Sequence, residues 1–217
     1  MQQFQGKVAA ITGAGSGIGR GLAHELARRG ASLALSDIDD AGLAETVALV
    51  EQSAGDRGSV KVASAHVDVT DRTAVDAWAT SVVEEFGQAN LIFNNAGVAL
   101  SANVGSMSYD SFRWLMDINF WGVVHGTLAF LPHLKASGDG HVINISSVFG
   151  LLGIPSQSAY NSAKFAVRGF TDALRTELDI ERCGVSATTI HPGGIRTNIA
   201  GNGRFAFADH EEAIDAA

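Results

Sequence analysis

Short apolar runs alternate with longer amphipathic stretches along most of the chain. The short runs are almost continuously apolar, which is typical of strands buried on both faces of a parallel sheet. They are Val8–Thr12, Ser32–Leu35, Val60–Val67, Leu91–Phe93, His141–Ile145 and Val185–Ile190. The amphipathic stretches between them predict helices at Gly19–Arg29, Leu43–Gln52, Ala74–Phe86, Ser111–Leu134 and Ser158–Arg182. This alternation predicts an α/β fold with a doubly wound, Rossmann-like parallel sheet.

Composition favours one domain over residues 1–217. The 217 residues are 46% hydrophobic, which suffices for one sizeable core and falls short of two. Glycine is abundant at 25 residues and proline scarce at 3, as suits tight turns between strands and helices. Neither a repeat nor a linker interrupts the pattern. Thr70 and Asp71 precede the third helical stretch as candidate caps.

Charge and cysteine content narrow the possible partners and location. A net charge of −8 disfavours nucleic acid and anionic membranes, which are bound mainly through lysine and arginine. The single cysteine, Cys183, cannot form an internal disulfide and fits a reducing compartment. No apolar stretch approaches the roughly 18 residues of a membrane span, and the polar start is unlike a secretory signal. We expect a cytoplasmic protein. The seven histidines show no metal-binding spacing, so no metal is expected.

A glycine-rich segment follows the first predicted strand and reads Thr12-Gly-Ala-Gly-Ser-Gly-Ile-Gly19. Glycines allow close approach of a ligand to the backbone, and the following helix presents free N–H groups to an anion. The segment predicts a pyrophosphate site made by Gly13, Ser16, Gly17, Ile18 and Gly19. Ile18 stands where the strict G-x-G-x-x-G fingerprint has its third glycine, so an ordinary glycine-rich turn is the alternative.

An acidic residue, Asp37, ends the second strand about 20 residues beyond the glycines. Its carboxylate can accept hydrogen bonds from the adenosine ribose hydroxyls of a dinucleotide. A 2′-phosphate there would meet Asp37, Asp39 and Asp40 with no basic residue in that loop, so the pattern favours NAD over NADP. A solvated helix cap is the alternative reading.

Several further motifs occur in a fixed order. They are Asp68-Val69, Asn94-Asn95-Ala96-Gly97, Asn119, Asn144-Ile145-Ser146-Ser147, Tyr160-x-x-x-Lys164 and Pro192-Gly193. Together with the glycine segment, they resemble the short-chain dehydrogenase/reductase family in its compact form, from Lys7 to about Thr197. The resemblance implies an oxidoreductase acting on the CH–OH group of its substrate.

The resemblance also implies where the dinucleotide binds. Asp68 and Val69 would hold the adenine, and Asn95, Ala96 and Gly97 would lie against the adenosine ribose. Pro192, Gly193, Ile195 and Thr197 match the segment beside the nicotinamide. Taken singly, each motif could be an ordinary turn or loop.

Tyr160 and Lys164 lie four positions apart on a predicted helix, so their side chains share one face. A tyrosine titrates near 10, too high for a base at neutral pH, and a nearby ammonium lowers that pKa. Tyr160 would then exchange a proton with the substrate oxygen. The resemblance adds that Lys164 binds the nicotinamide ribose. An exposed pair on an amphipathic helix is the alternative.

Two further candidates complete the predicted catalytic set. Ser147 follows the fifth strand and could hydrogen-bond the substrate oxygen; only the family spacing selects it over Ser146. Asn119 interrupts a helical stretch. The resemblance implies that the helix is kinked at this residue and that its main chain or side chain holds a water connecting Lys164 to solvent. Structural roles for both remain open.

The chemical class of the substrate is inferred from residues 100–105, 148–155 and Ile195, which are expected to surround it and are mostly small and apolar. They favour a neutral, fairly hydrophobic secondary alcohol or ketone. Trp78, Trp114 and Trp121 are expected in the core or in subunit contacts. No strand-like run follows Thr197, so the last strand of the family fold is expected to be missing, with truncation as the favoured reason.

Two other functions stay open. A non-catalytic NAD(P)-binding redox sensor could use the same fold, although such a protein can dispense with Tyr160 and Lys164. A sugar-nucleotide epimerase or dehydratase is disfavoured because such proteins resemble Thr-Gly-x-x-Gly-x-x-Gly chains, which carry a glycine where Ser16 stands, and have a larger C-terminal domain. By resemblance, a homodimer or homotetramer would form through the helices at 111–134 and 158–182.

Overall fold

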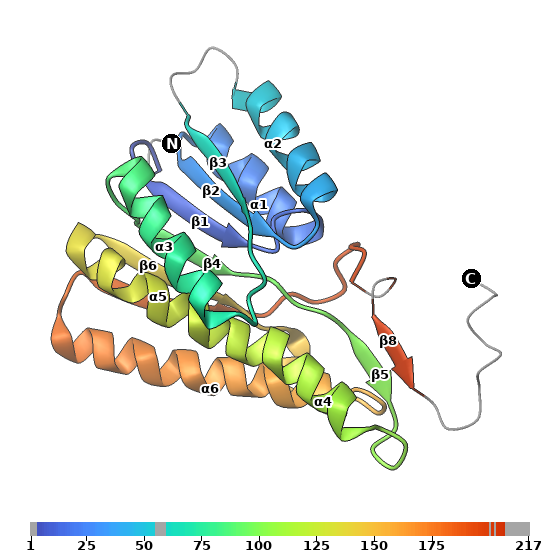
Figure 1. The fold of residues 1–217 in the computed structure, drawn as a ribbon. Helices are drawn as coiled ribbons and strands as arrows, with labels where there is room; N and C mark the ends of the chain where they lie inside the picture. The colour runs from blue at the N-terminus through green and yellow to red at the C-terminus, as the bar shows by residue number, and fades with distance from the viewer. Residues whose placement is uncertain (1–3, 55–59, 200, 202, 207–217) are drawn as a thin grey trace.

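A computed structural model describes residues 4–54, 60–199, 201 and 203–206. Its core is a six-stranded parallel sheet with the strand order β3-β2-β1-β4-β6-β7 (Figure 1). The strands are β1 (Val8–Thr12), β2 (Ser32–Asp37), β3 (Val62–His66), β4 (Leu91–Asn94), β6 (Gly140–Ile145) and β7 (Val185–Ile190). The predicted doubly wound sheet in a single domain is confirmed.

Helices cover both faces of this sheet (Figure 1). They are α1 (Gly17–Arg28), α2 (Asp40–Ala54), α3 (Arg72–Phe86), α4 (Tyr109–Met116), α5 (Gly122–Ser137) and α6 (Ser158–Glu181). Along β1, Ala9 and Ile11 pack toward α1 and α2, whereas Val8 and Ala10 pack toward α3, α5 and α6. This alternation follows from the two-residue period of a strand and explains why the run is apolar throughout.

Two short strands were missed, and one of them corrects an expectation. β8 (Arg204–Ala206) follows Thr197 and pairs in parallel with β5 (Leu100–Ala102) in a separate two-stranded sheet. The expectation that no strand follows Thr197 is therefore wrong. Strands of three residues carry too short an apolar pattern to be read from sequence. A seventh strand of the main sheet would fall beyond Ala206, outside the described residues.

The helical stretch predicted at 111–134 is three segments. α4 ends at Met116, a π-helical turn (η1) runs from Asp117 to Trp121, and α5 follows. Asp71 is a true cap, because its carboxylate accepts the backbone N–H groups of Thr73 and Ala74. Thr70 instead binds the Asp68 carboxylate.

The parallel order brings the carboxyl ends of all six strands to one edge of the sheet. Such edges are where open α/β sheets bind ligands. In the described part of the chain, no helix is both long and apolar enough to cross a membrane.

Candidate active site

A cavity of about 620 Å³ opens at the carboxyl ends of the strands. Of the residues proposed from sequence, it is lined by Gly13, Ser16, Gly17, Ile18, Asp37, Asp68, Val69, Asn95, Ala96, Gly97, Ser147, Tyr160, Lys164, Pro192, Gly193, Ile195 and Thr197. Gly19 and Asn119 lie behind its wall. The topology thus gathers predicted residues from seven separate segments around one space.

The glycine turn packs too closely for side chains at two of its positions. Gly13 has φ +65°, and a Cβ there would lie 2.8 Å from the Ala96 Cα. A Cβ on Gly19 would lie 2.1 Å from the Gly13 carbonyl oxygen. Glycine is therefore required for β1, the turn and α1 to meet. The start of α1 then faces the cavity with its free N–H groups.

Thr12 ties this turn to the end of β4 and was missed in the sequence. Its buried hydroxyl accepts the N–H groups of Asn95 and Ala96, each at 3.0 Å. The Asn95 side-chain amide donates hydrogen bonds to the Thr12 and Gly13 carbonyl oxygens. Thr12 precedes the glycine motif directly, and that position is the signal that could have identified it.

Asp37 has a structural contact in addition to its place in the cavity. Its Oδ2 accepts the Gly15 N–H at 2.7 Å, and its Oδ1 accepts the Asp39 N–H at 3.0 Å. The carboxylate is thereby held at the end of β2 between the glycine turn and α2. Ile38, Asp39 and Thr70 complete this end of the cavity.

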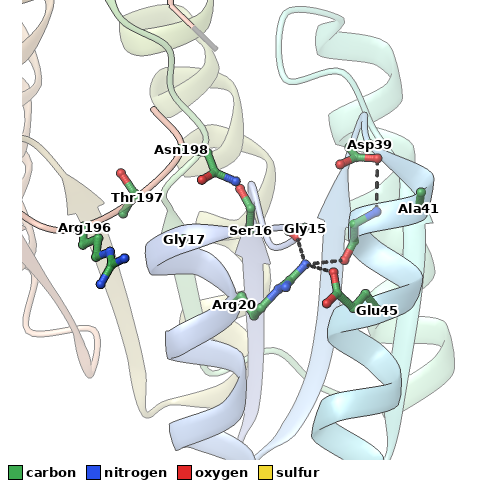
Figure 2. A pocket seen from close by; sticks show the side chains of 11 residues that line it. Gly15, Ser16, Gly17, Arg20, Asp39, Ala41, Glu45, Arg196, Thr197 and Asn198 are labelled. Carbon is green, nitrogen blue, oxygen red and sulfur yellow. Dashed lines mark hydrogen bonds and ion pairs between the residues drawn. The ribbon is translucent and has the colours of Figure 1, made fainter. Parts of the chain in front are cut away.

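A second, smaller cavity of about 390 Å³ adjoins the glycine turn (Figure 2). Arg20 crosses it, and its guanidinium donates to the carbonyl oxygens of Gly15 and Gly42 and to the Glu45 carboxylate. Arg20 and Asp39 therefore line the same small cavity, although Arg20 comes from α1 and not from the acidic loop at Asp37 to Asp40. The contacts of Arg20 fasten α1 to α2, and Glu45 balances its charge.

Tyr160 projects from the first turns of α6 into the cavity that Ser147 also lines, and its phenol lies close enough to the Ser147 hydroxyl for that group to affect its pKa. Burial raises the pKa of Tyr160, and the Ser147 hydroxyl partly offsets this increase. The sequence-based expectation that Lys164 lowers the Tyr160 pKa is not met here, because desolvation of the phenol dominates.

Lys164 is almost fully buried, with 3% of its surface exposed. Its Nζ donates to the Ile145 carbonyl oxygen at 3.0 Å and lies 5.5 Å from the centre of the Tyr160 ring. Burial lowers the pKa of Lys164 to about 8, since a cation loses hydration there. No carboxylate among the described residues forms an ion pair with it.

The two serines after β6 have different contacts. Ser146 donates its hydroxyl to the Lys164 carbonyl oxygen at 2.8 Å, which fixes α6 against the strand end. Ser147 reaches the Tyr160 phenol instead. The geometry therefore distinguishes two residues that chemistry alone leaves equivalent. His191, at 2.9 Å from the Ser147 carbonyl oxygen, supports the same turn.

Asn119 sits fully buried in the π-helical turn. Its side chain donates to the Val98 carbonyl oxygen and accepts the Val98 N–H, both at 2.8 Å. These two contacts fasten the end of β4 to the helix. A Cβ on Gly97 would lie 3.2 Å from the Asn119 Oδ1 and 3.6 Å from the Lys164 Nζ, so these groups crowd one small space.

Part of the cavity wall is apolar. Val98, Trp114, Ile118, Ile195 and Ile199 line it, whereas residues 100–105 and 148–155 do not. Of the segments used to infer the substrate, only Ile195 is placed in the wall. Leu100 instead packs under Tyr160 in a small core cluster.

The tryptophans have three different environments. Trp78 is core, as expected, and packs against Phe130. Trp121 is 49% exposed on the π-helical turn. Trp114 packs against a core cluster and, beyond that expectation, also lines the cavity and has the guanidinium of Arg204 over its ring. A helical tryptophan gives no sequence signal that separates these cases.

Three or more potential metal ligands do not come together anywhere in residues 4–54, 60–199, 201 and 203–206. His141 hydrogen-bonds the hydroxyls of Thr188 and Ser186 on the neighbouring strand.

Comparison with known proteins agrees with this geometry. The family model for short chain dehydrogenases matches residues 7–205. SadH of Mycobacterium tuberculosis strain H37Rv, whose given name classes it among oxidoreductases, is 52% identical over 99% of this chain and 76% of its own length.

Solved structures of the same type superpose closely. A short chain dehydrogenase/reductase from Burkholderia phymatum in complex with NAD has a TM-score of 0.88 at 36% identity, covering 93% of this chain and 70% of that one. Levodione reductase gives 0.87 at 36% identity over 92% and 76% of the two chains. An alcohol dehydrogenase from Thermococcus sibiricus, complexed with 5-hydroxy-NADP, gives 0.81 at 32% identity over 91% and 80%.

Proposed function

The chain belongs to the short chain dehydrogenase family of oxidoreductases, and from this premise we propose its reaction. The reaction is hydride transfer between NAD(H) and the carbon of a neutral, fairly hydrophobic secondary alcohol or ketone. One observation carries this proposal. Tyr160, Ser147 and Lys164 meet at the wall of a cavity that also reaches the glycine turn and Asp37.

The cavity residues suit a nicotinamide dinucleotide. The glycine turn and the start of α1 would hold the pyrophosphate, Asp37 the adenosine ribose, and Asp68 and Val69 the adenine. Asn95, Ala96 and Gly97 would lie against that ribose, and Pro192, Gly193, Ile195 and Thr197 beside the nicotinamide. Gly13 and Gly17 support this assignment, since both line the cavity at positive φ and present backbone without side chains where the pyrophosphate would lie. When bound, the dinucleotide supplies or accepts the hydride.

NAD is favoured over NADP by charge. Asp37 and Asp39 border the cavity at the adenosine end, and the nearby Arg20 guanidinium is already balanced by Glu45. Replacing Asp37→Asn keeps an acceptor for the Gly15 N–H and removes the charge. We expect the ratio of kcat/KM values for NADP(H) and NAD(H) to rise about tenfold. An unchanged ratio would contradict the assignment.

The protein side chains carry the proton. In ketone reduction, Tyr160 donates its phenolic proton to the substrate oxygen as the carbon gains hydride, and in alcohol oxidation it accepts that proton. Ser147 would hold the substrate oxygen within reach. Lys164 stabilises the resulting phenolate by its charge and would bind the nicotinamide ribose hydroxyls.

Asn119 would belong to a proton path to Lys164, because its side chain and the Lys164 ammonium both lie close to Gly97. Both ends of its side-chain amide already bind Val98, so the main chain of the π-helical turn is the better candidate to hold a water. Such a water would connect Lys164 with solvent while substrate is bound.

We also expect a homodimer or homotetramer formed through α4, α5 and α6. Trp121 and Leu128 and, on α6, Phe165 are between 43% and 55% exposed and offer apolar surface for such contacts. The single Cys183 still favours a reducing, cytoplasmic location.

A panel of ketones and alcohols, run separately with NAD(H) and NADP(H), tests the reaction. Tyr160→Phe should lower kcat by about 10²- to 10⁴-fold while dinucleotide binding is retained. Tyr109→Phe is the matched control, because Tyr109 is 92% exposed on α4. Undiminished turnover in Tyr160→Phe would refute the proposed mechanism. Binding without turnover of any substrate would favour a redox sensor.

A further inference from the structure

Arg204 makes a contact that the proposed reaction does not use. It begins β8, where its N–H donates to the Ala99 carbonyl oxygen at 3.0 Å and the residue pairs with Leu100. Its guanidinium lies over the ring of Trp114 on α4, 3.8 Å from the ring centre. Figure 1 shows β8 beside β5, so a late segment of the chain lies beside a strand from its middle.

Trp114 connects this contact to the reaction site. Trp114 lines the cavity and, like Tyr160, packs against the buried cluster that contains Leu100 and Ala159. β5 is also joined to the segment before α6, because the Ala102 N–H donates to the Ser156 carbonyl oxygen. The position of the indole is therefore coupled to the helix that carries Tyr160.

The charge of Arg204 has no acidic counterpart in the described part of the chain. Several other surface cations are paired there, as Arg29 is with Glu25 and Lys61 with Glu85, whereas Arg113, Arg182 and Arg196, like Arg204, form no ion pair with a described carboxylate. A guanidinium stacked on an indole is attracted by the ring's negative face and covers it from water. The contact thus favours one orientation of the Trp114 side chain.

We infer that Arg204 is a positioning residue that fixes Trp114 as a wall of the substrate compartment and so selects for ketones with a bulky apolar group. This inference rests on the proposed function. A small ketone would reach Tyr160 without touching the indole. A larger apolar group beside the carbonyl must pack against Trp114, and a mobile indole binds it less well.

Kinetics with matched ketones tests the inference. In Arg204→Ala, the KM for cyclohexyl methyl ketone should rise about fivefold, with kcat changed less and the KM for acetone unchanged. Arg204→Lys should retain part of the effect. In a Trp114→Ala background, Arg204→Ala should add nothing. Arg72→Ala, on α3, is the control and should leave all values unchanged.

Other outcomes would overturn the inference. An equal rise for both ketones would indicate a general structural role. A rise that persists without Trp114 would show that the stack is irrelevant. A rise confined to a ketone bearing a carboxylate would show that Arg204 binds substrate charge directly.

A second readout does not depend on turnover. The chain has three tryptophans, so NMR should give three indole N–H signals, and Trp114→Phe would identify one of them. Arg204→Ala should shift that signal and leave those of Trp78 and Trp121 in place. An unshifted Trp114 signal refutes the inference even if the wild-type protein turns over ketones. A shifted signal without any turnover would refute the proposed function alone.

Discussion

At the scale of single residues, burial governs the two titratable groups of the reaction site. Tyr160 and Lys164 share a poorly hydrated space, where each loses stability in its charged form. Burial thereby favours the protonated phenol of Tyr160 and the neutral amine of Lys164. Positive charge brought by a bound oxidised dinucleotide would oppose the first effect and would favour the phenolate, the form that accepts a proton in the proposed alcohol oxidation.

The chain offers a direct titration of Tyr160, because it contains two tyrosines and the other, Tyr109, is exposed. In Tyr109→Phe without dinucleotide, the remaining phenol should titrate above pH 10, since burial raises its pKa. Ultraviolet difference absorbance of tyrosinate measures this value. Adding NAD⁺ should lower it. A titration at or below pH 10 in the unliganded variant would contradict the burial argument.

Lys164 predicts a pH-dependent stability. Its folded pKa of about 8 lies below the value of 10.5 in the unfolded chain, so between these pH values the unfolded chain binds more protons and stability increases with pH. Below pH 8, the buried ammonium costs about 3 kcal/mol.

Lys164→Met removes that cost. The unfolding free energy of wild type minus that of the variant should therefore rise by about 3 kcal/mol between pH 7 and pH 10.5. Denaturant titrations at several pH values give this difference. Lys61→Met, at a half-exposed lysine, is the control. A flat difference for Lys164→Met would show that its ammonium is hydrated.

At the scale of elements, strand ends are fastened to one another by side chains, and Thr12 is the central case. Its hydroxyl satisfies two N–H groups at the end of β4, where β1 and the glycine turn must meet Asn95 and Ala96. The sheet ladder ends at this point, so these N–H groups have no strand partner there.

Thr12→Val keeps the shape of the side chain and leaves both N–H groups without their acceptor. We expect a loss of about 2 kcal/mol in unfolding free energy and weaker dinucleotide binding. Thr12→Ser retains the hydroxyl and should stay closer to wild type. Chemical denaturation and NADH fluorescence titration measure the two effects. Equal stability of Thr12→Val and wild type would mean that water replaces the hydroxyl.

At the scale of the whole molecule, the sequence predicts the fold better than it predicts the apolar residues that line the cavity. Long apolar runs indicate the main strands, and ordered motifs indicate residues that follow their ends, such as Asn95 and Ser147, and the Tyr160 of α6. β5, β8 and the Trp114–Arg204 contact depend on packing between distant segments, for which the local pattern carries no signal. The sequence therefore predicts substrate contacts at residues 100–105 and 148–155, whereas the apolar residues that line the cavity include Trp114 on α4, Ile118 on η1 and Ile195 and Ile199 after β7.

The central claim is that hydride passes between a nicotinamide ring and a carbon held beside Tyr160. NADH that carries deuterium at its transferable position tests it most directly, with cyclohexyl methyl ketone as substrate and mass spectrometry of the alcohol product. The account predicts one deuterium on the carbinol carbon with the wild-type protein and almost no product with Tyr160→Phe. Alcohol without deuterium, or equal labelling with Tyr160→Phe, would contradict it.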